Sequence, residues 1–183
     1  EIVEVIFISN CESINTVAAL ESLTTVYGVL LFHNLDALSN LDGLEHITGC
    51  ASIELWDNDL LENIEGIQNI ANTLMKSIVV SSNPLLESIA AMNNVTEAQN
   101  NVYIANNALL SSLQGLENLV STGELEIFDN PALTSLEGLN ALTSLAEYSH
   151  ISNNENLQRL NGLQNLTTVT DLYIADQNFG GNI

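Results

Sequence analysis

Basic residues are almost absent from this chain. Its 183 residues include two, Lys76 and Arg159, against 23 acidic ones, for a formal net charge of -21. So acidic a surface repels phosphate backbones and anionic lipid headgroups. Long apolar runs are also absent, since no stretch approaches the roughly 18 consecutive apolar residues of a membrane helix. We therefore expect a soluble protein that binds no nucleic acid and does not insert directly into a membrane.

Cysteine is scarce as well. The two cysteines, Cys11 and Cys50, are predicted to lie at opposite strand ends and two layers apart. The α-carbons of a disulfide lie within about 7 Å of each other. We therefore expect these two not to pair, and to be either small buried side chains or partners of residues outside this segment.

Motifs for catalysis are missing. The chain has no phosphate-binding glycine loop, no zinc-type cysteine pair, no His-Glu-x-x-His and no nucleophile elbow. The three histidines occupy different positions in the repeat described below: His33, His46 and His150. We expect a non-enzymatic protein without a cofactor or a histidine metal site. One alternative remains open, in which acidic pairs such as Glu54 with Asp57, or Glu126 with Asp129, collect Ca²⁺ through oxygen ligands.

The chain does contain an internal repeat. Short apolar runs end on a recurrent amide residue at intervals of 24, 24, 25, 24, 23, 24 and 24 residues: Asn10, Asn34, Asn58, Asn83, Asn107, Asn130, Asn154 and Gln177. A fixed period in this range is typical of a solenoid, in which each coil buries its apolar face against its neighbours. We predict about eight coils of 23–25 residues in a single domain over residues 1–183.

Each coil is predicted to contain one strand and a non-helical return. Residues before the amide alternate, as where Leu125 and Ile127 point inward and Glu126 and Phe128 outward. Equivalent strands run in the same direction and so form one parallel sheet. After the amide, apolar residues recur at every third position, a spacing that drifts off the face of an α-helix. The convex side should therefore be largely free of α-helix.

The recurrent asparagines are predicted to form a structural ladder. Their side chains can satisfy backbone groups of their own turn and of the adjacent coil. The expected members are Asn10, Asn34, Asn58, Asn83, Asn107, Asn130 and Asn154. The first two coils are out of register by one residue, because Ile14 and Leu38 follow their asparagines by four positions and later coils have three. We place the extra residue in the turn and keep Asn10 and Asn34 in the ladder.

The outward strand positions supply the candidate binding residues. On that register, aromatic, apolar and acidic side chains share the exposed face of the sheet: Leu30, Phe32, Glu54, Trp56, Tyr103, Glu126, Phe128, His150 and Tyr173. Leu30, Phe32 and Trp56 would form an apolar patch, and soluble monomers seldom leave a large patch bare. The alternative is that these side chains only stabilise the sheet through cross-strand contacts.

The repeat resembles the receptor L-domain type of leucine-rich repeat. The two units most similar to it are GELEIFDNPALTSLEGLNALTSL (residues 123–145) and YGVLLFHNLDALSNLDGLEHITG (residues 27–49). The resemblance implies a leucine-rich-repeat solenoid, α/β by convention but mostly β, on a bacterial, fungal or protist surface. It implies an extracellular or cell-surface location without specifying a ligand. The chain has neither the many cysteines nor the Cys-rich neighbour of the growth-factor receptors.

Two functions follow as hypotheses. In the first, the sheet face of an extracellular recognition or adhesion module binds a protein or a glycan on a cell surface or matrix. In the second, the chain is a structural repeat of a filament, cell wall or adhesin stalk and associates end to end. Both suit a segment of a longer protein. Two sequons, at Asn94 and Asn165, are candidates for N-glycosylation in a eukaryotic secretory pathway.

Overall fold

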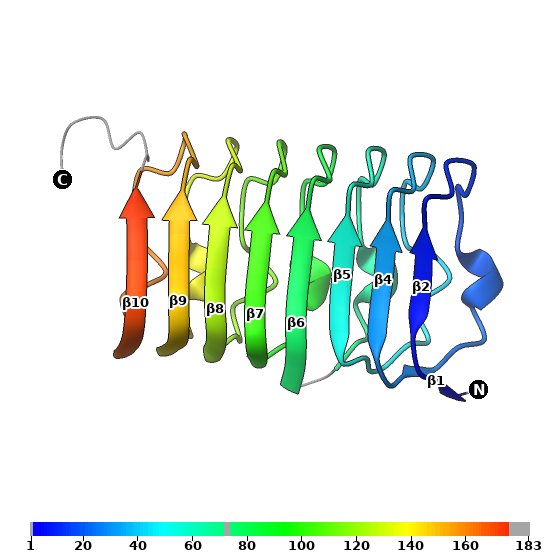
Figure 1. Cartoon of the computed structure of the whole chain (residues 1–183), viewed down its shortest axis with the longest axis horizontal. Helices are drawn as coiled ribbons and strands as arrows, with labels where there is room; N and C mark the ends of the chain where they lie inside the picture. The colour runs from blue at the N-terminus through cyan, green and yellow to red at the C-terminus, as the bar shows by residue number, and fades with distance from the viewer. Residues whose placement is uncertain (1, 72–73, 176–183) are drawn as a thin grey trace.

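The computed structural model describes residues 2–71 and 74–175 and shows a mostly-β solenoid of about seven turns. One parallel eight-stranded sheet, seen face-on in Figure 1, covers one side. Its strands, in spatial order from the N-terminal end, are β2 (Ile6–Ser9), β4 (Val29–His33), β5 (Ser52–Trp56), β6 (Leu74–Ser81), β7 (Glu97–Ala105), β8 (Ser121–Phe128), β9 (Ser144–Ser152) and β10 (Thr168–Ala175). A second, two-stranded parallel sheet pairs β1 (Ile2–Val3) with β3 (Thr25–Val26). The predicted Gln177 lies outside the described residues.

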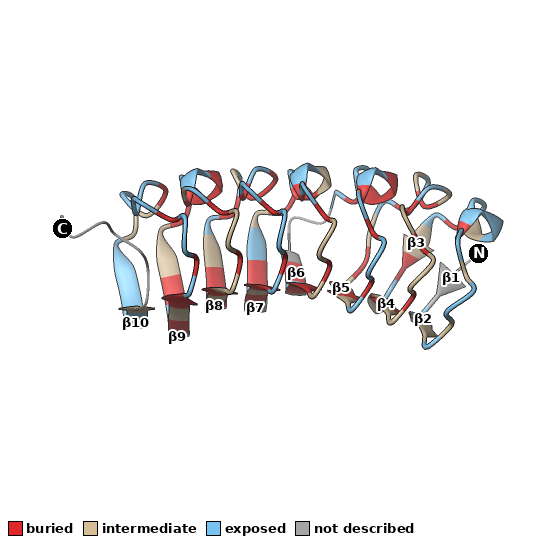
Figure 2. Cartoon of the chain, turned by 90° about the horizontal axis from the view of Figure 1, so that it is seen from above, coloured by how far each residue is buried: buried red, intermediate tan, exposed pale blue. Residues whose placement is uncertain are grey.

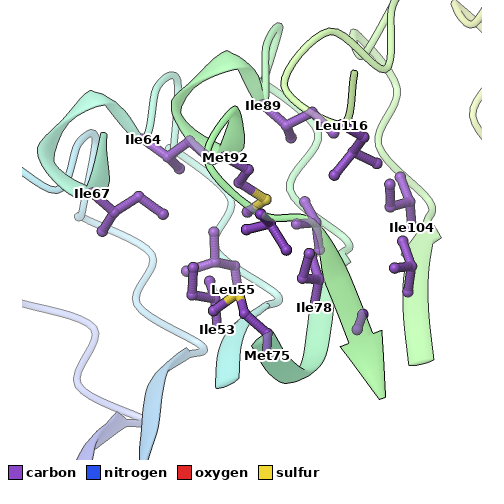
Figure 3. Close-up of a cluster of buried hydrophobic side chains, with 14 of the residues drawn as sticks. Ile53, Leu55, Ile64, Ile67, Met75, Ile78, Ile89, Met92, Ile104 and Leu116 are labelled. Carbon is purple, nitrogen blue, oxygen red and sulfur yellow. The ribbon is translucent and has the colours of Figure 1, made fainter. Parts of the chain in front are cut away.

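The core lies between the sheet and the returning segments (Figure 2). Strand residues such as Ile53 and Ile78 point away from the exposed sheet face toward convex residues such as Ile64 and Ile89, as Figure 3 shows. The step of three accounts for the convex contribution, since Leu133, Leu136, Leu139 and Leu142 are all fully buried. Each coil thus adds one apolar layer to a continuous core.

The convex returns take two forms, and within the described residues neither contains an α-helix, as predicted. Some coils carry a three-residue 3₁₀ turn: η1 (Ala18–Leu20), η2 (Glu65–Ile67), η3 (Ala90–Met92) and η4 (Glu137–Leu139). Other coils bend at a left-handed glycine, such as Gly115 (φ +112°), whose N–H donates to Glu117 Oε2 at 2.7 Å. A β-carbon on Gly115 would overlap the carbonyl of Ile89 in the preceding coil, so the layer spacing requires glycine there.

The register predicted for the first two coils is wrong. Strand β4 pairs with β5 so that Leu30 lies opposite Ile53 and Phe32 opposite Leu55. Leu30 and Phe32 are therefore inward residues, and both are fully buried. No extra residue occupies the turn, because the backbone geometry of Asn34 (φ +55°) matches that of the residue before Asn58, not that of Asn58 itself.

The corrected alignment restores one spacing throughout. The left-handed turn residue comes directly after the strand in seven coils: Asn10, Asn34, Asp57, Ser82, Asn106, Asp129 and Asn153. The ladder position follows it, and in the first two coils Cys11 and Leu35 occupy that position. The first inward convex residue then lies three positions later in every coil, including Ile14 and Leu38. The three-residue spacing between the ladder position and the first inward convex residue is therefore the same in all seven coils. What differs in the first two coils is that the asparagine lies at the turn residue, one position before the ladder position.

Candidate recognition face

An aromatic band crosses the exposed face of the sheet from β5 to β10. Its rings belong to Trp56, Tyr103, Phe128, His150 and Tyr173, with Tyr148 beside His150. Successive ring centroids lie 5.5, 5.3, 5.9 and 5.4 Å apart from Trp56 to Tyr173. Aromatic contacts at these distances stabilise each other by about 1 kcal/mol per pair. Each ring is therefore held by its neighbours as well as by its own strand.

Small residues beneath the rings allow the band to lie close to the sheet. Trp56 on β5 contacts Tyr103 on β7 although β6 lies between them, and adjacent strands are about 4.8 Å apart. The Trp56 ring must therefore lie above β6, where the outward residues are Val79 and Ser81. Both are buried despite pointing outward, at 5% and 3% exposure. Ala105, which flanks Phe128 on the face, is fully buried in the same way.

Carboxylates accompany the rings. In the column that runs across the strands, Glu126 lies between Tyr103 and His150. Partial burial and the neighbouring Glu124 raise the pKa of Glu126, while His150 lowers it by a smaller amount. Burial, followed by the charges of Glu126 and Asp129, raises the pKa of Tyr103. The face is therefore acidic as well as aromatic.

Trp56 marks the N-terminal end of the band, next to two further acids. Glu54 Oε2 accepts a hydrogen bond of 3.4 Å from Trp56 Nε1. Asp57 Oδ2 lies 3.3 Å from His33 Nε2, and both side chains are substantially exposed. These acids have separate partners, so Glu54 and Asp57 do not converge. Within the described part of the chain, no group of three or more His, Cys, Asp or Glu residues could hold a metal ion.

Most predicted face residues do come together. The structure places Glu54, Trp56, Tyr103, Glu126, Phe128, His150 and Tyr173 on one surface. The expectation that Leu30 and Phe32 join them is wrong, because the one-residue slip turns both into the core. No apolar patch of these two residues therefore lies beside Trp56. The outward neighbours in that region are instead Leu31 and His33.

Two aromatic residues at the face were missed by the sequence analysis. Tyr148, which is 53% exposed, lies two residues before His150 and shares its side of β9. Simple alternation from His150 would have found it. Phe7, which is 63% exposed, lies opposite Leu31 in the corrected register. The predicted register, which kept Asn10 in the ladder, would turn Phe7 toward the core.

The buried asparagine ladder begins at the third coil. Asn58, Asn83, Asn107, Asn130 and Asn154 are all fully buried. Each Oδ1 from Asn83 onward accepts from the backbone N–H of the preceding ladder residue, at 3.0–3.3 Å. Each Nδ2 donates to a strand carbonyl of the preceding coil, as Asn107 does to Val80 at 2.9 Å. The ladder thus satisfies polar groups that packing has removed from water.

Asn10 and Asn34 are not members of that ladder. Asn34 Nδ2 donates to Asn10 Oδ1 at 3.0 Å, but the pair lies outside the core. The ladder ends where Leu35 N–H donates to Asn58 Oδ1 at 3.2 Å. Leucine in place of asparagine offers no amide to continue it.

Both sequon asparagines lie in a second, exposed amide column on the convex side. Asn94 Nδ2 donates to the Gln68 carbonyl at 3.1 Å, and Asn165 Nδ2 donates to the Asn140 carbonyl at 2.8 Å. Equivalent bonds join Asn69 and Asn118 to the coils before them. This column was not predicted from the sequence, although its 24- and 25-residue spacings are visible in the repeat. Both sequon side chains remain exposed to solvent.

The two cysteines differ in burial and do not pair with each other. Cys11 is partly buried and Cys50 is buried, and no disulfide joins them. Burial raises the pKa of the Cys50 thiol to about 12. None of the helical segments in the described part of the chain has the length and apolarity that crossing a bilayer demands.

Depressions on the molecule lie away from the aromatic band. One is an open, polar hollow on the convex side, lined by residues that include Ser112, Glu117 and Glu137. Another lies at the amino ends of the strands, beside Tyr27, Cys50 and Lys76. Neither contains any of the candidate binding residues of the sheet face. Comparison with protein-family models, with curated proteins and with solved structures found no match for the chain.

Proposed function

We propose that this protein is a non-enzymatic recognition module, outside the cell or on its surface, that binds a protein or a glycan through the exposed face of its parallel sheet. The observation that carries the proposal is the aromatic band, a chain of ring contacts across six strands. Aromatic side chains dominate binding energy at interfaces because they remove much apolar area from water with few rotatable bonds.

Rigid support favours this proposal. The band lies mainly on the carboxyl-terminal parts of the strands, where neighbouring strands pair residue by residue, and the buried ladder fixes the turns at the ends of those strands. A preorganised surface loses less conformational entropy on binding than a mobile one. Tyr148 and Tyr173, which are 53% and 51% exposed, still offer contact area.

We further infer that the solenoid is of the receptor L-domain type of leucine-rich repeat, with about eight coils. The eight-stranded parallel sheet, the 23–25-residue period and the buried asparagines support this type. A cell-surface location is supported by the acidic composition and by the exposed positions of Asn94 and Asn165, which point away from the binding face. Sequence adjoining this segment would test the location, because a cytoplasmic enzyme domain there would contradict it.

The binding proposal is tested with a panel of immobilised glycans and extracellular proteins. We expect the double variant Trp56→Ala/Phe128→Ala to weaken binding of any probe that the parent protein binds by tenfold or more, since two anchors of about 1–2 kcal/mol each are lost. The matched control is Leu109→Ala, which removes an exposed apolar side chain from a turn outside the sheet. Binding that survives the double variant, or a panel that the parent ignores, would contradict the proposal.

A structural role is the second candidate, favoured by the open edges of the sheet. Strands β2 and β10 each pair on one side only within the described residues. An unpaired strand edge is a template for another strand, so a second copy could continue the sheet end to end. Light scattering over a range of protein and salt concentrations tests this. Mass that stays constant at one chain throughout would count against it.

A further inference from the structure

The aromatic band contains acids that lack partners within the chain. Glu124 and Glu126 both lie on β8, and within the described residues neither carboxylate takes part in a hydrogen bond or an ion pair. Glu126 is partly buried between Tyr103 and His150, where desolvation and the charge of Glu124 disfavour its ionised form. Glu126 therefore lies at the centre of the band with no lysine or arginine beside it, and the neighbouring His150 only partly offsets the effect of its burial.

The chain itself has almost no cation to offer. Lys76 lies at the amino end of β6, away from the band, and Arg159 lies on an exposed return segment. Among the described residues, the one close contact between a basic and an acidic side chain joins His33 Nε2 to Asp57 Oδ2. Apart from the neighbouring His150, positive charge at Glu126 therefore comes from another molecule.

The ring geometry favours a cation over a sugar. Successive ring planes differ by 37°, 88°, 30° and 36° from Trp56 to Tyr173, so the rings do not form one flat platform for a row of pyranose faces. A cation needs the face of a single ring, within about 6 Å of its centroid. If that cation is an arginine side chain of a partner, it can also reach a neighbouring carboxylate, because a guanidinium group both stacks on a ring and forms charge-assisted hydrogen bonds.

We propose that the aromatic band binds an arginine- or lysine-containing segment of a partner protein, with a cationic side chain between the rings and Glu126. The inference rests on the proposed function and specifies the partner's chemistry. Charge complementarity supports it over the whole molecule, since a net charge of -21 attracts a basic segment and increases its rate of association.

Hexaarginine is the probe, and hexacitrulline is its uncharged counterpart of nearly the same shape. Trp56 is the only tryptophan in the chain, so its fluorescence reports occupancy of the band directly. We expect hexaarginine to change this fluorescence on binding and hexacitrulline to bind at least tenfold more weakly, as loss of both the cation–π and the ionic contacts requires.

Two substitutions separate the site from the general negative charge. Glu126→Gln and Glu87→Gln each remove one negative charge, but Glu87 is exposed on the convex side. We expect Glu126→Gln to weaken hexaarginine binding about fivefold and Glu87→Gln to leave it within a factor of about two. Calorimetry on both variants, with thermal unfolding as a check on folding, gives the comparison.

Several outcomes would overturn the inference. These are equal weakening by the two variants, equal binding of the citrulline peptide, absence of hexaarginine binding, or a Trp56 response to cellohexaose in place of hexaarginine. The outcome for the proposed function is distinguishable from the outcome for the cationic partner. If Trp56→Ala/Phe128→Ala abolishes binding of a panel member while Glu126→Gln and the citrulline peptide have no effect, the face is a binding site and its partner is not cationic.

Discussion

The first two coils and the later ones share a backbone but differ in what occupies two of its positions. From the third coil onward, the position after the left-handed turn residue is a buried asparagine, and the outward strand positions carry the aromatic band. In the first two coils that position holds Cys11 and Leu35. The asparagines there lie one residue earlier, at the turn itself.

This difference shows that asparagine has two separate uses in the same turn. At Asn34 it tolerates φ +55°, as asparagine does more readily than most residues. At Asn107 the side chain joins two coils through buried hydrogen bonds, accepting from the Asn83 N–H and donating to the Val80 carbonyl. The sequence pattern does not distinguish these uses, so one of them led to the wrong register. The consequence is functional, because a one-residue shift exchanges the core and the binding face.

The largest expected effect comes from comparing two single substitutions, one of a phenylalanine in the second coil and one of a phenylalanine in the aromatic band. Phe32→Ala should lower the free energy of unfolding by about 3–5 kcal/mol, because it leaves a cavity in the core. Phe128→Ala should cost about 2 kcal/mol, since it removes the two ring contacts of a partly exposed side chain, with Tyr103 and His150. Urea unfolding followed by circular dichroism measures both. Equal losses would mean that the two residues lie in similar environments, contrary to the register found here.

The next test separates the two uses of asparagine. Asn107→Ala deletes the acceptor for the Asn83 N–H and the donor for the Val80 carbonyl, and should destabilise by about 2–3 kcal/mol. Asn34→Gly keeps the left-handed turn and removes only an exposed side-chain bond, so we expect a change of about 0.5 kcal/mol or less. The midpoints of denaturant unfolding give the two values. A loss at Asn34 as large as that at Asn107 would place Asn34 in the ladder after all.

The smallest effect contrasts an acid in the second coil with one in the band. The backbone N–H of Gly43 donates to Glu45 and lowers the pKa of that carboxyl, whereas burial raises the pKa of Glu126. Stabilisation by Glu45 is full above its unfolded pKa and is lost as the pH falls through its folded pKa. Ionised Glu126 instead destabilises the folded state. This destabilisation is full above the folded pKa of Glu126 and is relieved as the pH falls below its unfolded pKa.

Matched glutamine substitutions make the contrast measurable. At pH 7 we expect Glu126→Gln to raise Tm relative to Glu45→Gln, although both variants lose the same charge. The difference should shrink as the pH falls, first as the Glu126 penalty is relieved and then as Glu45 is protonated at its lowered folded pKa. Thermal unfolding at several pH values checks this, and a gap that persists in acid would show that the effect is not electrostatic.

The chain's periodicity by itself determined the solenoid, the parallel sheet, the non-helical returns and the central asparagine ladder. Apolar spacing of two in the strands and three in the returns leaves few other ways to bury these leucines and isoleucines. It also placed Trp56, Tyr103, Phe128, His150 and Tyr173 on one face, because strand alternation is a local property.

Only the tertiary structure decided the register of the first two coils and the assembly of the band. Leu30 and Phe32 carry no local sign of burial, and the pairing with Ile53 and Leu55 on β5 is what turns them inward. Likewise, the contact of Trp56 with Tyr103 depends on small outward residues on the intervening strand β6. One of these is Ser81, which lies 25 residues after Trp56 in the chain. Pairing between coils and packing over a neighbour are long-range interactions, and a single repeat does not encode them.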